Sequence, residues 1–242
     1  SGARGDASFG LSWLDSDGFP TRSGDATYRD YANRSLTAAA RTDLGAVELG
    51  FRAWHAEGTS EYSDFFVTPV DQDFENSALA LTAGFSPTDS WESRLMVGHA
   101  VDDLEKNQSP DFLDTERYTL DWKNDFALTE RHSLTAGLLW QDEEADAESF
   151  GLPYDATTTS RQLYLQDQAT FGAHRLLLAA GYTDHETFGG HTTWNAEYGF
   201  AIGDRALVTF AAGTAFRAPD ATDLYGFGSN PDLAAEESQS YE

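Results

Sequence analysis

Two histidines near residue 190 are the residues whose type and spacing most resemble a chemical site. His185 and His191 flank a predicted hairpin, and Asp184 and Glu186 stand on either side of the first of them. Imidazole and carboxylate groups in such an arrangement can bind a metal ion or act as an acid and base pair. The alternative is that all four are solvated turn residues, which is the more common role of a loop histidine beside acidic residues. The sequence favours this second interpretation.

The other chemistry-bearing residues give no support for catalysis. His55 and His99 lie on separate predicted strands, and no sequence feature brings them together. A serine nucleophile would need a recognisable motif around it, and a phosphate site would need a glycine-rich loop, but the sequence contains neither. The chain has no cysteine, which excludes thiolate metal sites, redox pairs and disulfides. We therefore predict that the protein is not an enzyme.

The elements that must carry these residues are predicted to be β-strands. Apolar and polar residues alternate over segments of about ten residues, the pattern of a strand with one apolar face. The clearest segment is 117–128, with the sequence RYTLDWKNDFAL, in which one face is apolar and the other charged. Starting from a first strand near Ala7 to Trp13, such segments give about eleven strands, and a twelfth begins near Ser238. Almost no part of the chain is left for helices.

The connections between these strands alternate in length. Short turns are predicted at 43–45, 86–89, 129–132, 172–174 and 203–205. Longer loops rich in Asp, Gly and Pro are predicted at 15–33, 58–75, 102–115, 143–158 and 217–237. Outer-membrane barrels combine short periplasmic turns and long outer loops with strands of about 9–11 residues. We therefore predict an all-β, antiparallel transmembrane β-barrel rather than a soluble β-sandwich, with some of its tryptophans in the interfacial girdles.

Composition excludes two other classes of protein. Among 242 residues there are 15 Lys and Arg against 41 Asp and Glu, which gives a formal net charge of −26. Such a chain would be repelled by nucleic acid, so no nucleic-acid partner is expected. No stretch approaches the roughly 18 apolar residues of a transmembrane helix, which excludes a helical membrane protein. In a barrel, the acidic residues can occupy lumen-facing positions and outer loops.

The last third of the chain carries a set of motifs at fixed spacing. They are GTAFRAP at 213–219, DLYG at 223–226, NPDL at 230–233 and EES at 236–238, ahead of Tyr241 and Glu242. This set resembles a signature of TonB-dependent outer-membrane transporters, with Ala235 where many members have proline. Within that family the chain looks most like the vitamin B12 (cobalamin) branch, through residues 224–231, 188–194 and 62–76.

This resemblance implies a fold, a function and a set of partners. It identifies residues 1–242 as an internal part of a barrel of about 22 strands, without the plug domain and the remaining strands. The implied function is import of cobalamin or another corrinoid, energised by the TonB complex through the plug, in the outer membrane of a Gram-negative bacterium among lipid and lipopolysaccharide. A ferric-siderophore or haem receptor is the alternative within the family. A complete small barrel acting as a pore, adhesin or enzyme is the alternative outside it, and it would require the first and last strands to pair.

The resemblance also implies a calcium site in the first outer loops. Members of the cobalamin branch hold calcium there with clustered carboxylates, a tyrosine and backbone oxygens, and a hard cation needs six to eight oxygens from neighbouring loops. The alternative is that these acids are solvated loop residues of an acidic chain. The corresponding oxygen ligands in this sequence are Asp15, Asp17, Asp30, Tyr62, Asp64, Asp71 and Asp73.

Three aromatic residues in the next two loops are the expected substrate contacts. Phe112, Phe150 and Tyr154 could lie against a corrin ring at the mouth of the lumen. They could equally stabilise their own loops or contact lipopolysaccharide. Arg217 belongs to the family signature, and we expect it to be structural at a strand end rather than a substrate ligand.

Overall fold

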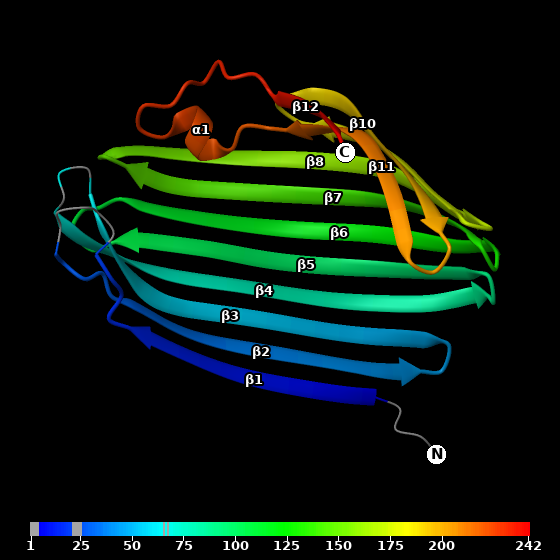
Figure 1. Cartoon of the computed structure of the whole chain (residues 1–242). Helices are drawn as coiled ribbons and strands as arrows, with labels where there is room; N and C mark the ends of the chain where they lie inside the picture. The colour runs from blue at the N-terminus through cyan, green and yellow to red at the C-terminus, as the bar shows by residue number, and fades with distance from the viewer. Residues whose placement is uncertain (1–4, 21–25, 65, 67) are drawn as a thin grey trace.

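The described part of the chain forms one curved antiparallel sheet. The computed structural model describes residues 5–20, 26–64, 66 and 68–242, and the middle of the first predicted loop lies outside these ranges. Each strand pairs with its neighbours in sequence, and the order runs from β1 to β12 without a crossover (Figure 1). The elements are β1 (Gly5–Ser16), β2 (Tyr31–Leu44), β3 (Val47–Ser63), β4 (Pro69–Thr88), β5 (Trp91–Lys106), β6 (Phe112–Thr129), β7 (His132–Ser149), β8 (Leu152–Phe171), β9 (His174–His185), β10 (Gly189–Ile202), β11 (Ala206–Arg217), the helix α1 (Ala221–Tyr225) and β12 (Glu236–Tyr241).

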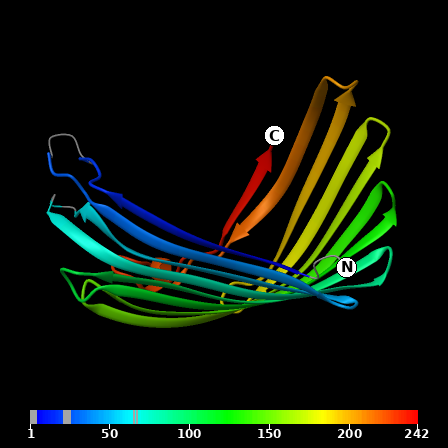
Figure 2. The ribbon, with the colours of Figure 1, turned by 90° about the horizontal axis from the view of Figure 1, so that it is seen from below.

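The sheet bends into an open trough. Figure 2 shows β9 to β11 rising away from the strands of the first half, so that the sheet curves partway round. Among the described residues β1 pairs with β2 alone and β12 with β11 alone. The alternative of a complete small barrel required β1 to pair with β12, and that expectation is therefore wrong for this structure. The prediction of antiparallel barrel strands, about eleven and the start of a twelfth, is confirmed.

Strict alternation divides the side chains between two faces. In the β5–β6 ladder Leu95 lies opposite Trp122, and one residue away Arg94 lies opposite Lys123. We call the apolar face of the spanning region the outer face and the polar one the inner face, because barrel strands turn apolar residues to lipid and polar residues to the lumen. A shift of one residue in the register would exchange the two faces along a whole strand, so the pattern fixes the register.

The outer face ends in an aromatic belt near the short turns. The indole N–H of Trp91 donates to Asn124 Oδ1 at 3.0 Å, and that of Trp122 donates to Ser93 Oγ at 3.0 Å. The ring of Trp91 also stacks on Phe126 at 5.7 Å. Tryptophans with an apolar body and a satisfied N–H suit the membrane interface. By contrast, Trp54 lies on the inner face.

At the end of the sheet opposite the short turns, the strands extend further than the sequence predicted. β4 and β8 each have 20 residues, about twice the length needed to cross the bilayer at a tilt. Most of the predicted loop 143–158 is strand, with a two-residue turn at Phe150 and Gly151, and the loops 58–75 and 102–115 shrink in the same way. The composition of these segments is acidic, but their alternation continues, and the backbone ladder satisfies its own polar groups outside the membrane as well. Ala145 and Ala147 are buried on the inner face of this extension.

The predicted loop 217–237 contains α1, a five-residue helix that the sequence reading did not anticipate. No helix in the described residues is long and apolar enough to cross a membrane.

Candidate functional site

The segment between β11 and β12 is organised around Arg217, the last residue of β11. Its guanidinium lies 3.0 Å from Asp223 Oδ2, 3.8 Å from Asp220 Oδ2 and 3.6 Å from Glu236 Oε1. Asp220 caps the N-terminus of α1, since its side chain accepts the N–H of Asp223 at 2.8 Å. The side chain of Asp223 accepts the N–H of Asp220 in return, which completes a capping box. Residues 217–236, which we call the strap, are therefore tied at both ends to the same arginine, and the expectation that Arg217 is structural agrees with this.

The strap folds back over the inner face and contacts the β7–β8 hairpin. The hydroxyls of Tyr154 and Thr222 share a hydrogen bond of 3.1 Å. The N–H of Phe227 donates to Ser149 Oγ at 3.3 Å, and the ring of Phe227 lies 4.6 Å from that of Phe150. These contacts hold α1 beside β8 (Figure 1).

A pocket of about 500 Å³ lies between α1 and the inner face of the sheet. Its floor comes from β3 to β7 and its roof from the first residues of α1. The lining is apolar over much of its area, with four charged side chains. The residues are Trp54, Asn76, Ser77, Ala78, Ala100, Val101, Asp102, Leu113, Thr115, Arg117, Glu143, Ala145, Asp220, Ala221 and Thr222.

The charges of this pocket are dominated by acids. Arg117 is the one cationic residue in the lining, and it lies directly opposite Glu143 in the β6–β7 ladder. Its Nε donates to Glu143 Oε2 at 2.7 Å, and its Nη2 contacts the same oxygen. Asp102 and Asp220 are the other two acids. The pocket thus combines one tryptophan, small apolar residues and a net negative charge.

A buried acid supports the hairpin beneath the strap. Asp111 is 6% exposed and accepts a hydrogen bond of 3.0 Å from Lys106 Nζ. Burial alone would raise the pKa of Asp111, but the hydrogen bond and charge of Lys106, helped by Phe150 N–H and Ser109, lower it below its ordinary value. Lys106 Nζ also lies 5.3 Å from the ring centroid of Phe150. This cluster is a fixed support for the tip of the β7–β8 hairpin.

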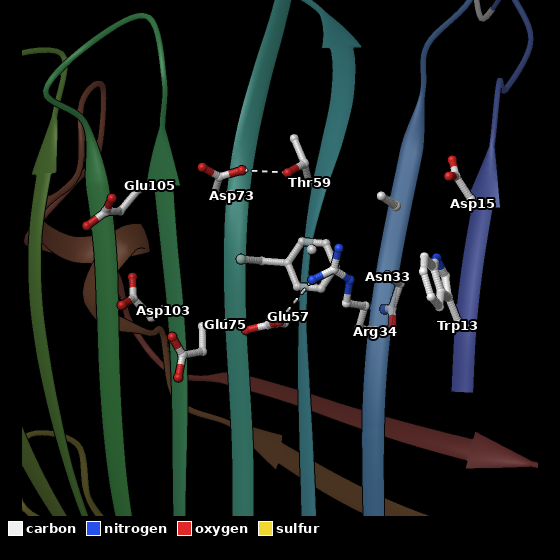
Figure 3. Close-up of a pocket in the computed structure, with 13 residues that line it drawn as sticks. Trp13, Asp15, Asn33, Arg34, Glu57, Thr59, Asp73, Glu75, Asp103 and Glu105 are labelled. Carbon is white, nitrogen blue, oxygen red and sulfur yellow. Dashed lines mark hydrogen bonds and ion pairs between the residues drawn. The ribbon is translucent and has the colours of Figure 1, made fainter. Parts of the chain in front are cut away.

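A second groove lies on the outer face above the apolar band. Figure 3 shows Trp13 and Asp15 at one end of it, Arg34 beside Glu57 in the middle, and carboxylates from β4 and β5 at the other end. Arg34 Cζ lies 5.5 Å from the centroid of Trp13 and its Nη1 lies 3.9 Å from Glu57 Oε1. The acidic residues of the groove are Asp15, Glu57, Asp73, Glu75, Asp103 and Glu105.

The predicted calcium ligands are not assembled in this structure. Asp15 and Asp73 line the outer groove in one row, but they lie three strands apart, about 14 Å at the usual strand spacing. Asp71 instead binds the side-chain amides of Asn107 and Gln108. In the part of the chain that the structure describes, no three His, Asp or Glu side chains are grouped to hold a metal. The calcium site stays a prediction.

The other predicted ligands lie in turns or at strand ends. The carboxylate of Asp64 accepts the N–H of Thr68 at 2.7 Å, which closes the β3–β4 turn. Asp30 receives the backbone N–H of Glu61 on its carbonyl oxygen at 2.9 Å. Asp17 follows β1, and Tyr62 is the penultimate residue of β3.

Two of the three predicted substrate aromatics lie against the strap. Phe150 occupies the tip of the β7–β8 turn and Tyr154 the start of β8, and both contact the strap as described above. Phe112 begins β6 in register with Glu105 and Glu148, on the outer face. The structure therefore brings Phe150 and Tyr154 together and places Phe112 on the other side of the sheet.

The histidines of the β9–β10 hairpin form turn contacts. His185 Nδ1 accepts the N–H groups of Thr187 and Phe188 at 3.3 and 3.4 Å. His191 stacks on Phe216 at 3.9 Å, and its Nδ1 lies 3.1 Å from Glu237 Oε1. His185, the last residue of β9, has the predicted turn role, whereas His191 lies within β10 with its side chain only 18% exposed and is packed rather than solvated.

The residues that sequence reasoning missed are those of the inner pocket. Trp54, Arg117 and Glu143 come from three strands, and their common location depends on ladder register and on the position of α1. One signal was available for α1 itself, because Asp220 and Asp223 after Pro219 have the spacing of a capping box.

Comparison with known proteins agrees with this architecture. The family described as TonB dependent receptor-like, beta-barrel matches residues 3–242. The chain is 28% identical over 236 residues to the vitamin B12 transporter BtuB of Photobacterium profundum. This match covers 93% of this chain and 38% of that protein. Among solved structures, the ferric enterobactin receptor PfeA of Pseudomonas aeruginosa in complex with enterobactin has a TM-score of 0.77 at 14% identity, over 94% of this chain and 42% of PfeA.

The copper transporter OprC has a TM-score of 0.71 at 14% identity, over 99% of this chain and 46% of OprC. At such identities these two structures show the fold alone. The chain spans about two fifths of the length of these relatives. The chain belongs to the β-barrel family of TonB-dependent receptors.

Proposed function

We propose that this chain is part of an outer-membrane receptor that binds and imports cobalamin or a related corrinoid. The observation that carries the proposal is the pocket between α1 and the inner face, which is lined by a tryptophan, small apolar residues and four charged side chains. Its support from relatives is the similarity to a B12 transporter along 93% of the chain. Ligand sites of this kind are concave and mostly apolar, with a few placed polar groups.

In this proposal the chain provides a wall of the lumen and part of its outer mouth. The strap and the β7–β8 hairpin contact the substrate as it enters, and Phe150 and Tyr154 act through the strap that they hold. A plug domain outside this chain is remodelled by the TonB complex in the inner membrane, so that transport depends on affinity and gating without bond chemistry. The surrounding partners are the lipid and lipopolysaccharide of a Gram-negative outer membrane.

A ferric-siderophore or haem receptor is the second candidate. It is favoured by the fold shared with PfeA, whose solved complex holds enterobactin. That likeness concerns the barrel and carries no residue of a ligand site to this chain. The corrinoid proposal is preferred because the similarity to the B12 transporter extends through the sequence and is not confined to the fold.

We also propose that calcium orders the first outer loops of the complete receptor. Asp71 would have to exchange its amide partners for the ion, and Asp15 and Asp73 would have to approach each other, so that binding would require a rearrangement of this region. Calcium titration of the purified receptor, followed by thermal unfolding, tests the idea. An unchanged midpoint at millimolar calcium would contradict it.

The direct test of function is equilibrium binding of cyanocobalamin to the full-length receptor in detergent. We expect saturable binding, with a ferric siderophore as the competing probe. The same measurement with and without calcium shows whether the ion contributes. If cobalamin does not bind in either condition and the ferric siderophore does, the second candidate replaces the first.

A further inference from the structure

The inner pocket contains a cation whose charge is cancelled in place. Among its described lining residues Arg117 is the one base, against the acids Asp102, Glu143 and Asp220. Arg117 directs both Nε and Nη2 at a single oxygen of Glu143. Both groups remain partly open to the pocket, since the side chain of Arg117 is 48% exposed and that of Glu143 is 29% exposed. The pair is therefore placed where a bound ligand would meet it.

A second arginine on the inner face is also paired with acids. Arg217, at the base of the strap, lies within 4 Å of three carboxylates. A carboxylate group or a catecholate oxygen of a ligand entering this region would therefore meet acids first, and the two guanidinium groups nearby already have anionic partners. Recognition of anions in proteins depends on free guanidinium donors. The described lining of this pocket lacks them, and Arg52, two residues before Trp54 on the same face of β3, lies outside that lining.

We propose that Glu143 is a specificity-determining residue that masks Arg117 and so selects neutral or cationic metal chelates over polyanionic ones. This inference rests on the proposed function, because it assumes that the pocket under α1 is a substrate site. Discrimination arises from a repulsive element, the carboxylates, as much as from any attractive contact. A neutral ligand loses nothing by meeting the paired charges, whereas a polyanion is repelled by the net charge and finds no free cation among the described residues that line the pocket.

The test measures binding of three probes to the full-length receptor in detergent. Cyanocobalamin is a neutral corrinoid, ferrichrome is a neutral iron chelate, and ferric enterobactin is a polyanionic iron chelate. The wild-type receptor is expected to bind at least one neutral probe more tightly than ferric enterobactin. Glu143→Gln is expected to tighten binding of ferric enterobactin by about tenfold, with a smaller change for the neutral probes.

Three further variants separate masking from a general charge effect. Glu92→Gln is the matched control, because Glu92 also pairs with an inner-face arginine, Arg94, at 2.8 Å but lies at the short-turn end, outside this pocket. It should leave all three affinities unchanged. The double variant Arg117→Gln with Glu143→Gln should lose most of the gain of the single variant. Asp102→Asn, which leaves the ion pair in place, should give a smaller gain and keeps the test valid if Glu143→Gln does not fold.

The outcomes distinguish this inference from the proposed function. Preference for ferrichrome without cobalamin binding would end the corrinoid proposal and leave the charge selection standing. Cobalamin binding together with an unchanged enterobactin affinity in Glu143→Gln and Asp102→Asn would end the charge selection and leave the corrinoid proposal standing. Tight binding of ferric enterobactin by the wild type without cobalamin binding, or binding of none of the probes, would overturn both, whereas tight binding of ferric enterobactin beside cobalamin would end the charge selection alone.

Discussion

The ring of Phe150 lies 4.6 Å from the ring of Phe227 and joins the tip of the β7–β8 hairpin to the strap. Phe150 holds this position at a φ of 52°, where residues other than glycine, asparagine and aspartate are uncommon. Gly151 follows at a φ of 77°, so the turn has the two positive angles of a type I′ hairpin, which favours Asn-Gly. An unfavourable backbone angle at a ring contact suggests that the contact is the reason for phenylalanine here.

Phe150→Asn should therefore separate the turn from the strap. Asparagine suits the backbone angle and should keep the hairpin at least as stable, while the loss of the ring contact should loosen residues 217–236. Both rings are largely exposed, 69% and 62%, so the expected loss is at the low end of an aromatic pair, about 0.5 kcal/mol. Hydrogen exchange of the full-length receptor should show faster exchange in the strap and unchanged protection in β7 and β8. Equal loss of protection in all three would contradict this division of roles.

Asp111→Asn should destabilise the cluster of Asp111, Lys106 and Phe150 that supports the same hairpin. The change removes a charged hydrogen bond from Lys106 at a buried position, and we expect a loss of about 1–3 kcal/mol at neutral pH. The pKa of the Asp111 carboxyl is lowered in the folded state, so its stabilising effect is complete above the ordinary value of 3.8 and is lost as pH falls through the lowered value.

Chemical unfolding of wild type and variant measures this difference. The gap between them should be constant from neutral pH down to about the ordinary Asp pKa and should close in more acidic solution. A gap that grows on acidification would mean that Asp111 is neutral in the folded protein.

The strand pattern could be predicted from the sequence because alternation reports directly which face each side chain occupies. Residues 117–128 are an example, because the apolar and charged side chains of this segment lie on opposite faces of β6, as the sequence indicates. The extended strands were missed at segments such as 143–149, where the alternation continues but the acidic composition looks like that of a loop. The inner pocket could not be predicted, because the contact of Thr222 with Tyr154 depends on how the strap folds back over the sheet.

Trp122→Phe should weaken the interfacial belt by a small, defined amount. The indole N–H donates to the hydroxyl of Ser93, a side chain with no exposed surface, and phenylalanine would leave that hydroxyl without its donor. We expect a loss of about 0.5–1.5 kcal/mol in the free energy of unfolding. Adding Ser93→Ala should recover part of it, because removing both partners of a buried hydrogen bond costs less than removing one. An additive double variant would show that the hydrogen bond contributes nothing.

Asp103→Asn, unlike the other substitutions, should increase the free energy of unfolding. Asp103 stands on the outer face directly between Glu75 and Asp114 in the ladders of β4, β5 and β6. Burial raises the pKa of Asp103, and repulsion from Asp114, Glu105, Glu75 and Asp102 raises it further. Like charges directly opposite each other in a sheet are destabilising, and removing one should give about 0.2–1 kcal/mol at neutral pH and low salt.

Two dependences identify repulsion as the cause of that gain. The carboxylate costs stability at every pH above its raised pKa, and the cost vanishes below the ordinary value of 3.8, so the advantage of Asp103→Asn should disappear in acid. It should also shrink at about 1 M salt, where charges more than a few ångströms apart are screened. Asp89→Asn, in the β4–β5 turn, is the control and should change stability little under any of these conditions. A gain for Asp103→Asn that persists in both acid and high salt would point to packing rather than to charge.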